Sequence, residues 1–406
     1  MTRGINGFQP GRLAQILAIR RLSQVQVATM VGVSPSTISK WRVGPQAPEA
    51  DKLERLASVV NVQPEWFTRP IQEKTTTPLF RSNASAHKAA REMLEGRLEW
   101  AQEIAASLEE FVDFPAVHFP EKTFTNPEEI TPEDIEAAAQ DCRDLWRLGS
   151  GPIPDVALAL ENAGAILIRE ETGVAQIEGL SAWSHRLQRP LVLLAADKDN
   201  GFRSRFDAAH ELGHVVLHKH IPRATERLRH NEMEKQAHRF AGAFLLPAES
   251  FSAEIRLPVT LDSLLLLKQR WGVSVAALVM RLDALGLISE EDKLSLFKRR
   301  SARWGVKSEP GDDGRIPEKP RLLKRTIELL LSSNTMPADG IARHFGLSAQ
   351  DIEMLAGLPE GFLSNDKADV IPLSGLRIRQ QPETAEAGIS TGTVLAFQRR
   401  SKGRKP

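Results

Sequence analysis

Two histidines and a glutamate stand close together in the chain, at a spacing that a helix turns into one cluster. In AAHELGHVVLHKH, residues 208–220, His210 and His214 are four apart and Glu211 follows the first. Four residues advance a helix by about 400°, so both imidazoles project from one face and reach a single ion. Glu211 lies about 100° round the helix, where its carboxylate faces a water molecule on the open side of that ion. The pattern predicts a zinc site with two histidine ligands and Glu211 as the general base.

The alternative is a helix whose histidines are only solvated. The apolar residues around the motif favour a buried helix instead: Phe206, Ala209, Val216 and Leu217. Buried imidazoles need partners, and a metal ion is one. Gly213, inside the motif, has no side chain and lets a second element pass close to the helix.

A metal site of this kind needs a third protein ligand, and NEMEKQAHRFAGAFLLP, residues 231–247, offers one. A helical wheel of this segment puts Glu234 at the border of the apolar face and turns Glu232 toward water. A carboxylate at the margin of a core is costly unless a cation receives it, so we expect Glu234 to be the third ligand. Glu232 and Asp207 are the substitutes. The purely structural alternative is a rim glutamate paired with Arg or Lys.

The spacing HExxH on a helix is typical of zinc metalloproteases, and peptide hydrolysis by such a site also requires a donor that stabilises the tetrahedral oxyanion. The sequence contains no tyrosine, so histidines and arginines are the candidates. We expect His185 to take this role, and an ordinary exposed loop histidine is the alternative. Four histidines are nearer the motif in sequence, although any of them can be a surface residue: His218, His220, His230 and His238.

The segments RSRFDAAHELGHVVLH and EKQAHRFAGAFLLP together resemble the ImmA/IrrE family of metallopeptidases. The preceding stretch IEGLSAWSHRLQRPLVLLAAD, residues 177–197, is similar to the strands of that family, and the resemblance spans roughly residues 150–250. It implies zinc bound by the two motif histidines and a downstream glutamate, with the motif glutamate as catalytic base. It also implies cleavage of a protein, often a repressor, in stress response or mobile-element control.

The N-terminal segment predicts four short helices, because its apolar residues recur at spacings of three and four. Ser23 is placed to cap the second helix, Gly32 to turn the chain after it, and Ser34 followed by Pro35 to begin the third. A helix, a short turn and a second helix form the unit that lays one helix in the major groove of DNA.

This segment resembles the Xre/Cro-type helix-turn-helix family, with Leu22-Ser23-Gln24, Gly32-Val33-Ser34 and Thr37-Ile38-Ser39 among the matches and Arg42 where the family has Glu. The resemblance implies that Gln24 contacts phosphate and that Ser36, Thr37 and Lys40 face base edges and nearby phosphates. Residues 1–70 carry nine basic residues against four acidic ones, which favours DNA as a partner. A helix-turn-helix used only for packing or dimerisation is the alternative.

Length and composition set the broad class. The 406 residues exceed what one hydrophobic core usually organises, so two or three domains are expected. Cys142 is the only cysteine, which excludes an internal disulfide and a multi-cysteine zinc site. No apolar run of membrane-spanning length and no secretory signal is present, so we expect a cytoplasmic protein without a membrane partner.

The expected fold is mainly α with a small β-sheet, an α+β class, in which one helix breaks at Gly164 and runs into a strand. Residues 338–355 repeat the pattern of helix, glycine turn and capped helix but lack a basic face, so packing or protein recognition is favoured there over DNA binding. The predicted organisation is a helix-turn-helix domain at 1–70, linkers at 71–90 and 301–320, a peptidase domain at 91–300, a helical region at 321–364 and a basic tail at 365–406.

Two functions fit these patterns. The first is a zinc endopeptidase whose helix-turn-helix brings it to a DNA-bound target or to its own promoter. The second is a transcription regulator whose peptidase-like domain senses a metal or ligand without proteolysis. The complete set of three ligands and a base favours the first, with DNA and a protein substrate, such as a repressor, as partners. The sequence leaves the oligomeric state open, a homodimer included.

Overall fold

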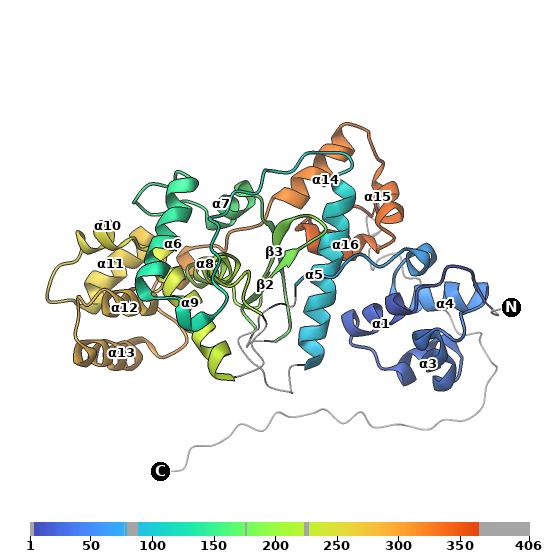
Figure 1. Cartoon of the computed structure of the whole chain (residues 1–406), viewed down its shortest axis with the longest axis horizontal. Helices are drawn as coiled ribbons and strands as arrows, with labels where there is room; N and C mark the ends of the chain where they lie inside the picture. Colours follow the sequence, from blue (N-terminus) through green and yellow to red (C-terminus); the bar gives the residue numbers. More distant parts are fainter. Residues whose placement is uncertain (1–3, 77, 79–87, 175–176, 223–226, 365–406) are drawn as a thin grey trace, which may run out of the picture. The chain divides into compact units, whose positions relative to one another are not determined.

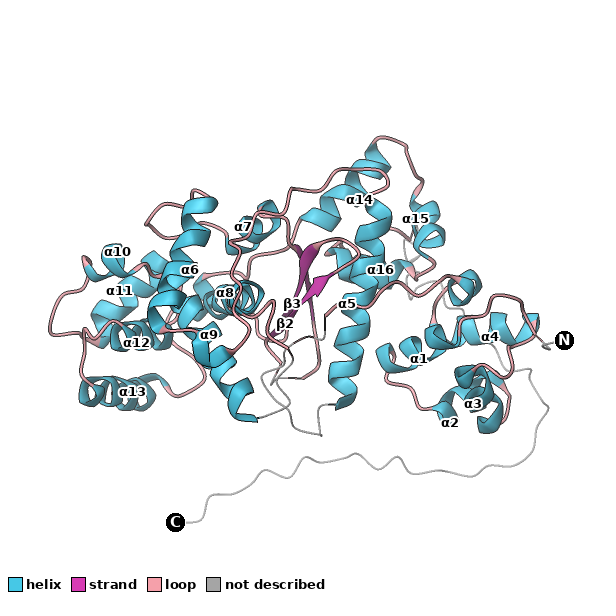
Figure 2. Ribbon diagram, viewed as in Figure 1, coloured by secondary structure: helices cyan, strands magenta, loops and turns pink. Residues whose placement is uncertain are grey.

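The computed structural model of the chain describes residues 4–364, apart from residues 77, 79–87, 175–176 and 223–226. The described chain is helical except for one small sheet, which confirms the α+β class (Figures 1 and 2). The basic tail predicted at 365–406 lies outside the described residues.

Four N-terminal helices form as predicted. Ser23 caps the second helix in a reciprocal box with Gln26, Gly32 turns the chain at φ 76°, and Ser34 caps the third by accepting the Thr37 N–H. Each cap satisfies backbone donors that a helix start leaves without partners. The bounds are α1 Pro10–Ile19, α2 Gln24–Val31, α3 Pro35–Val43 and α4 Ala50–Val60.

The sheet has the strand order β1-β3-β2, with β1 parallel and β2 antiparallel to β3. Gly164 ends the preceding helix at φ 95°, and a Cβ there would lie 2.8 Å from the Val117 Cα, so the turn into β1 requires glycine. The bounds are α7 Val156–Asn162, β1 Ile166–Glu170, β2 Gly179–Ser184 and β3 Arg189–Ala195.

The two faces of the sheet belong to two different cores. Ile166, Ile168 and Leu193 face a core shared with the N-terminal helices, α5 and the C-terminal helices. Leu167 and Val192 face the other core, which α6, α8, α9, α11 and α12 complete. The bounds are α5 Lys88–Leu108, α6 Pro132–Leu145, α8 Gly201–Leu217, α9 Arg227–Leu245, α10 Ala248–Ser252, α11 Leu261–Trp271, α12 Val275–Ala284, α13 Glu290–Trp304, α14 Leu322–Ser332, α15 Ala338–Phe345 and α16 Ala349–Ala356.

The first four helices pack on the rest of the described chain, despite the linker expected at residues 71–90. Arg12 of α1 forms an ion pair with Glu103 of α5 at 2.5 Å, and Arg20 contacts Asp351 of α16. Gly96 of α5 permits the close approach, since a Cβ there would lie 2.5 Å from the Ile19 Cγ1. The sequence gives no sign of these contacts because they join residues far apart in the chain.

The second expected linker, residues 301–320, is likewise anchored. α13 continues to Trp304, and buried Glu309 then forms ion pairs with Lys268 and Arg300. Glu318 forms an ion pair with Arg205 of α8. Among the described residues no single helix has the length and apolar character to span a membrane, and α11 with α12 meets that test only as a pair bent by 100°.

Candidate metal centre

Helix α8 carries the motif through the second core, between the sheet and α9. Asn200 caps it by accepting the N–H groups of Phe202 and Arg203. At the crossing with α9, a Cβ on Gly213 would lie 3.1 Å from the Ala237 Cα, so only glycine lets the two helices come this close. The structure therefore confirms that a second element passes at Gly213, and that element is α9.

Three donor atoms converge at this crossing. The Nε2 atoms of His210 and His214 are 3.1 Å apart. The Glu234 carboxylate lies 3.5 Å from the first of them and 3.4 Å from the second. One ligand atom from each of the three residues falls within 4.8 Å of the others. The sequence prediction grouped the same three side chains.

The donor set fits a zinc ion. Burial lowers the pKa of His214, which keeps its imidazole neutral and able to bind a metal. Burial alone would raise the pKa of Glu234, but the neighbouring imidazoles of His210 and His214 outweigh it and hold the pKa below its ordinary value. Two neutral imidazoles and one carboxylate from a helix pair are a set that zinc takes in sites with an open coordination position. Asp207 and Glu232, the substitutes considered from sequence, lie outside this cluster.

A buried hydrogen-bond chain extends from the far side of His214. Its Nδ1 lies 2.9 Å from the Nδ1 of His218, whose Nε2 lies 3.0 Å from the Gln236 Oε1. The Gln236 Nε2 donates to the carbonyl of Pro127 at 2.6 Å. His218 and Gln236 are only 4% and 3% exposed, so solvent does not compete for these bonds.

The direction of this chain follows from its last acceptor. A carbonyl only accepts, so the Gln236 NH2 faces Pro127 and its oxygen accepts from the His218 Nε2–H. Burial lowers the pKa of His218 well below its ordinary value, so this imidazole is neutral and its Nδ1 is an acceptor. The His214 Nδ1–H then donates to it, which leaves the His214 Nε2 unprotonated and facing Glu234.

The sequence analysis did not find this role for His218. The available signal was its spacing, since it is four residues beyond His214 and so on the same helical face. Gln236 and Pro127 carried no comparable signal, because nothing local relates a proline loop to a helix more than a hundred residues later.

Glu211 occupies a dry position beside the second strand. It is 4% exposed, and its Oε2 has no hydrogen-bond partner in the described chain. A Cβ on Gly179 of β2 would lie 3.0 Å from the Glu211 Oε1. Burial raises the pKa of Glu211 well above its ordinary value, and a hydrogen bond from Ser181 opposes this in part. A carboxylate with raised proton affinity is suited to general-base work near neutral pH.

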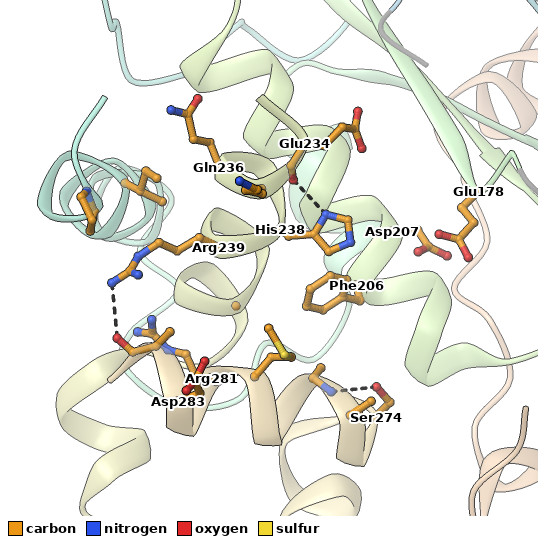
Figure 3. Close-up of a pocket in the computed structure, with 18 of the residues that line it drawn as sticks. Glu178, Phe206, Asp207, Glu234, Gln236, His238, Arg239, Ser274, Arg281 and Asp283 are labelled. Carbon is orange, nitrogen blue, oxygen red and sulfur yellow. Dashed lines mark hydrogen bonds between the residues drawn. The ribbon is translucent and has the colours of Figure 1, made fainter. Parts of the chain in front are cut away.

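A cavity of about 820 Å³ opens beside the ligand Glu234, between α8, α9 and α12 (Figure 3). His238 lies in it, with its Nδ1 2.9 Å from the Glu234 carbonyl and its ring centroid 4.5 Å from that of His210. Phe206 and Met280 add apolar surface to the wall. Of the three clustered donors, Glu234 lines this cavity.

His185 is exposed, in the turn that follows β2. It lines a second cavity, of about 460 Å³, together with His214 and His218. His185 thus shares one cavity with His214, and His238 lines the other. The role of His185 stays a prediction.

The DNA-facing residues lie on the second and third helices. Ser36 and Lys40 are exposed on α3, and Thr37 is half-buried with its hydroxyl 2.9 Å from the Ser34 Oγ. Gln24, at the start of α2, faces the guanidinium of Arg42. With the Gln24 amide oxygen turned toward Arg42, that oxygen lies 2.7 Å from the Arg42 Nη1. The structure brings these side chains to two adjoining helices, and their contacts with DNA stay predictions.

Fold and site together define a helix-turn-helix protein that carries a domain of metallopeptidase type. Family models agree: a helix-turn-helix model matches residues 13–67, and the model of the IrrE N-terminal-like domain, a peptidase family, matches residues 160–283. The chain therefore fuses a helix-turn-helix domain to an IrrE N-terminal-like domain, which confirms the resemblance seen in the sequence. No curated protein matches the chain.

Proposed function

We propose that this chain is a cytoplasmic zinc endopeptidase that cleaves a regulatory protein, such as a repressor, in stress response or mobile-element control. The proposal rests on one observation: His210, His214 and Glu234 converge beside the buried carboxylate of Glu211, whose Oε2 has no hydrogen-bond partner among the described residues. The match to a peptidase family supports the reaction, and the helix-turn-helix domain supports DNA as the partner that localises it.

In this proposal three residues bind the metal ion and a fourth, Glu211, transfers the proton. The two histidines and Glu234 would hold the ion, which when bound supplies Lewis-acid activation of water and of the peptide carbonyl. The Glu211 Oε2 accepts the proton of the attacking water and then passes it to the leaving amine. Gly179 lies against this carboxylate and helps to keep it dry, which sustains its proton affinity, while the hydrogen bond from Ser181 positions it and opposes that rise in part.

Two histidines compete for the role of oxyanion donor. His185 is the sequence-based candidate and lines the cavity that contains His214. His238 is held by a hydrogen bond to the Glu234 backbone, next to the ring of His210. Replacing each by alanine separates them, because loss of an oxyanion donor lowers kcat by about 10²–10³-fold while leaving metal content intact.

Glu211→Gln tests the proposal. The variant keeps size and burial but cannot take a proton, so we expect about one zinc per chain and no cleavage of cellular proteins when proteomes with wild-type and variant chains are compared. His214→Ala is the matched control, which should lose the metal as well as the activity. Equal cleavage by Glu211→Gln would refute the assigned base. Metal-dependent DNA binding without any cleavage would instead support the sensor function.

A further inference from the structure

The strand nearest to Glu211 is an edge strand. Among the described strands β2 pairs with β3 alone, so one side of its backbone faces away from the sheet. Backbone groups in an antiparallel pair alternate between the partner strand and the outside. The Ala195 N–H donates to the Glu178 carbonyl, which sets the phase of this alternation. The backbone groups of Gly179, Ser181 and Trp183 therefore point outward.

One outward position is occupied by the chain itself. The Thr76 N–H donates to the Trp183 carbonyl at 2.9 Å, and the Trp183 N–H donates to the Thr76 Oγ1 at 2.8 Å. The first is a backbone bond of the kind that an added strand makes with an edge residue, and in the second the Thr76 hydroxyl takes the place of a backbone carbonyl. Thr76 belongs to residues 73–76, here called the interdomain segment, which lies between the helix-turn-helix domain and α5.

The interdomain segment runs against the direction of β2. The carbonyl of Glu73 accepts from the Gln102 Nε2 at 2.8 Å, and the Gln102 Oε1 accepts from the Ser184 hydroxyl at 2.6 Å. Glu73 is thus tied to the Ser184 end of β2 and Thr76 to the preceding residue, Trp183. As its residue numbers rise, the segment moves toward lower numbers in β2, which is the antiparallel arrangement.

The remaining outward positions lie against the proposed base. A Cβ on Gly179 would lie 3.0 Å from the Glu211 Oε1, and the Ser181 hydroxyl lies 3.5 Å from the Glu211 carbonyl. Within the part of the chain that the structure describes, the outward backbone groups of Gly179 and Ser181 have no hydrogen-bond partner. Thr76 also lines the cavity that contains the ligand His214. An open sheet edge at this place is a template for an extended peptide.

We propose that the interdomain segment is an intramolecular competitor of an extended substrate peptide: it occupies the Trp183 end of the outer edge of β2, along which such a peptide would pair as an antiparallel strand. This inference rests on the proposed function, because it takes the bound peptide to be a substrate of the peptidase. A peptide that pairs beyond Ser181 must displace Thr76. Because this segment follows directly on the helix-turn-helix domain, capture of a long peptide releases one of that domain's tethers.

Thr76→Pro tests the competition. It removes the N–H and the hydroxyl that bind Trp183 and leaves β2 unchanged. Thr75→Pro adds the same ring one residue earlier and is the matched control, while Thr76→Val removes only the hydroxyl and covers the case that the proline variant does not fold. We expect hydrogen exchange at the Trp183 amide to be slow in wild type and Thr75→Pro, faster in Thr76→Val and fastest in Thr76→Pro.

The probe peptide is IQEKTTTP, the sequence of residues 71–78. Added to full-length Thr76→Pro, it should restore protection of the Trp183 amide, and the same peptide N-methylated at the residue equivalent to Thr76 should not. Hydrolysis of unfolded casein should be about tenfold more efficient in Thr76→Pro than in Thr75→Pro, as expected for loss of two competing hydrogen bonds of ordinary strength.

The two proposals fail separately. If no variant cleaves casein while exchange and peptide protection behave as expected, the proposed reaction is wrong and the docking edge stands. If the Trp183 amide exchanges alike in Thr76→Pro and Thr75→Pro, or if the peptide gives no protection, the docking edge and its competitor are wrong, whatever the activity.

Discussion

Replacing Gln236 by alanine tests the hydrogen-bond chain behind the metal centre. The substitution removes the acceptor of the His218 Nε2–H, 3.0 Å away, and the donor to Pro127, 2.6 Å away. Without that acceptor, nothing selects which nitrogen of His218 carries the proton. His214 can then place its own proton on Nε2, the atom that faces Glu234 and that a metal needs unprotonated.

The expected cost in metal affinity follows from these contacts. Both lost bonds are buried and neutral, and each such bond contributes about 1 kcal/mol. Partners of this kind behind a metal ligand change metal affinity by about 10–100-fold when removed. Since both histidines remain in place, we expect Gln236→Ala to weaken zinc binding by about tenfold, near the lower end of that range.

The assay is competition for Zn²⁺ between the protein and a chromophoric chelator. Gln236→Glu is the matched control, because its carboxylate still accepts from the His218 Nε2–H but has no proton to give to Pro127. That variant should keep metal affinity near the wild-type value while losing stability. Equal zinc affinity of Gln236→Ala and wild type, within a factor of about two, would show that the chain does not set the protonation of His214.

Three further predictions address the helix crossing, the sheet and the DNA contact. Gly213→Ala puts a methyl group 3.1 Å from the Ala237 Cα, so it should push α8 and α9 apart, lower stability by about 1–3 kcal/mol in urea titration and weaken zinc binding; an unchanged zinc affinity would contradict the tight crossing. Burial raises the pKa of Glu170 to about 7, so the folded state binds more protons than the unfolded state between about pH 4.5 and 7, and the free energy of unfolding should fall as pH rises through that window. Glu170→Gln should flatten this dependence, and an identical pH profile would contradict it. Thr37→Ala combined with Lys40→Ala should weaken DNA binding in gel-shift titration without altering zinc content, and unaltered binding would remove the assignment of α3 to the groove.

The cluster of His210, His214 and Glu234 was predictable because helical periodicity determines which side chains share a face. His210 and His214 share a face by spacing alone, and the apolar pattern of the next helix turns Glu234 toward the core. The same local rules predicted the capped starts at Ser23 and Ser34, each of which accepts a backbone N–H in the structure.

Positions set by distant contacts could not be predicted in this way. The proton on His214 depends on a carbonyl at Pro127, and the place of α1 depends on an ion pair between residues 331 apart, Arg20 and Asp351. No periodicity relates such residues, because their proximity follows from how completed elements pack. The tail from 365 onward is a prediction that the described residues do not reach.

The packing changes what the fusion of the two domains implies. A freely hinged helix-turn-helix would bring the peptidase-like domain to DNA and affect nothing else. Here the N-terminal helices share a core with one face of the sheet, and the interdomain segment is hydrogen-bonded to the sheet edge beside Glu211. Any event that displaces this segment from Trp183 must also loosen the tether of the DNA-binding helices, and a stable DNA complex that needs them displaced would in turn free the edge. The two effects are reciprocal, because displacement of the segment from Trp183 and displacement of the DNA-binding helices are coupled equilibria that involve the same segment.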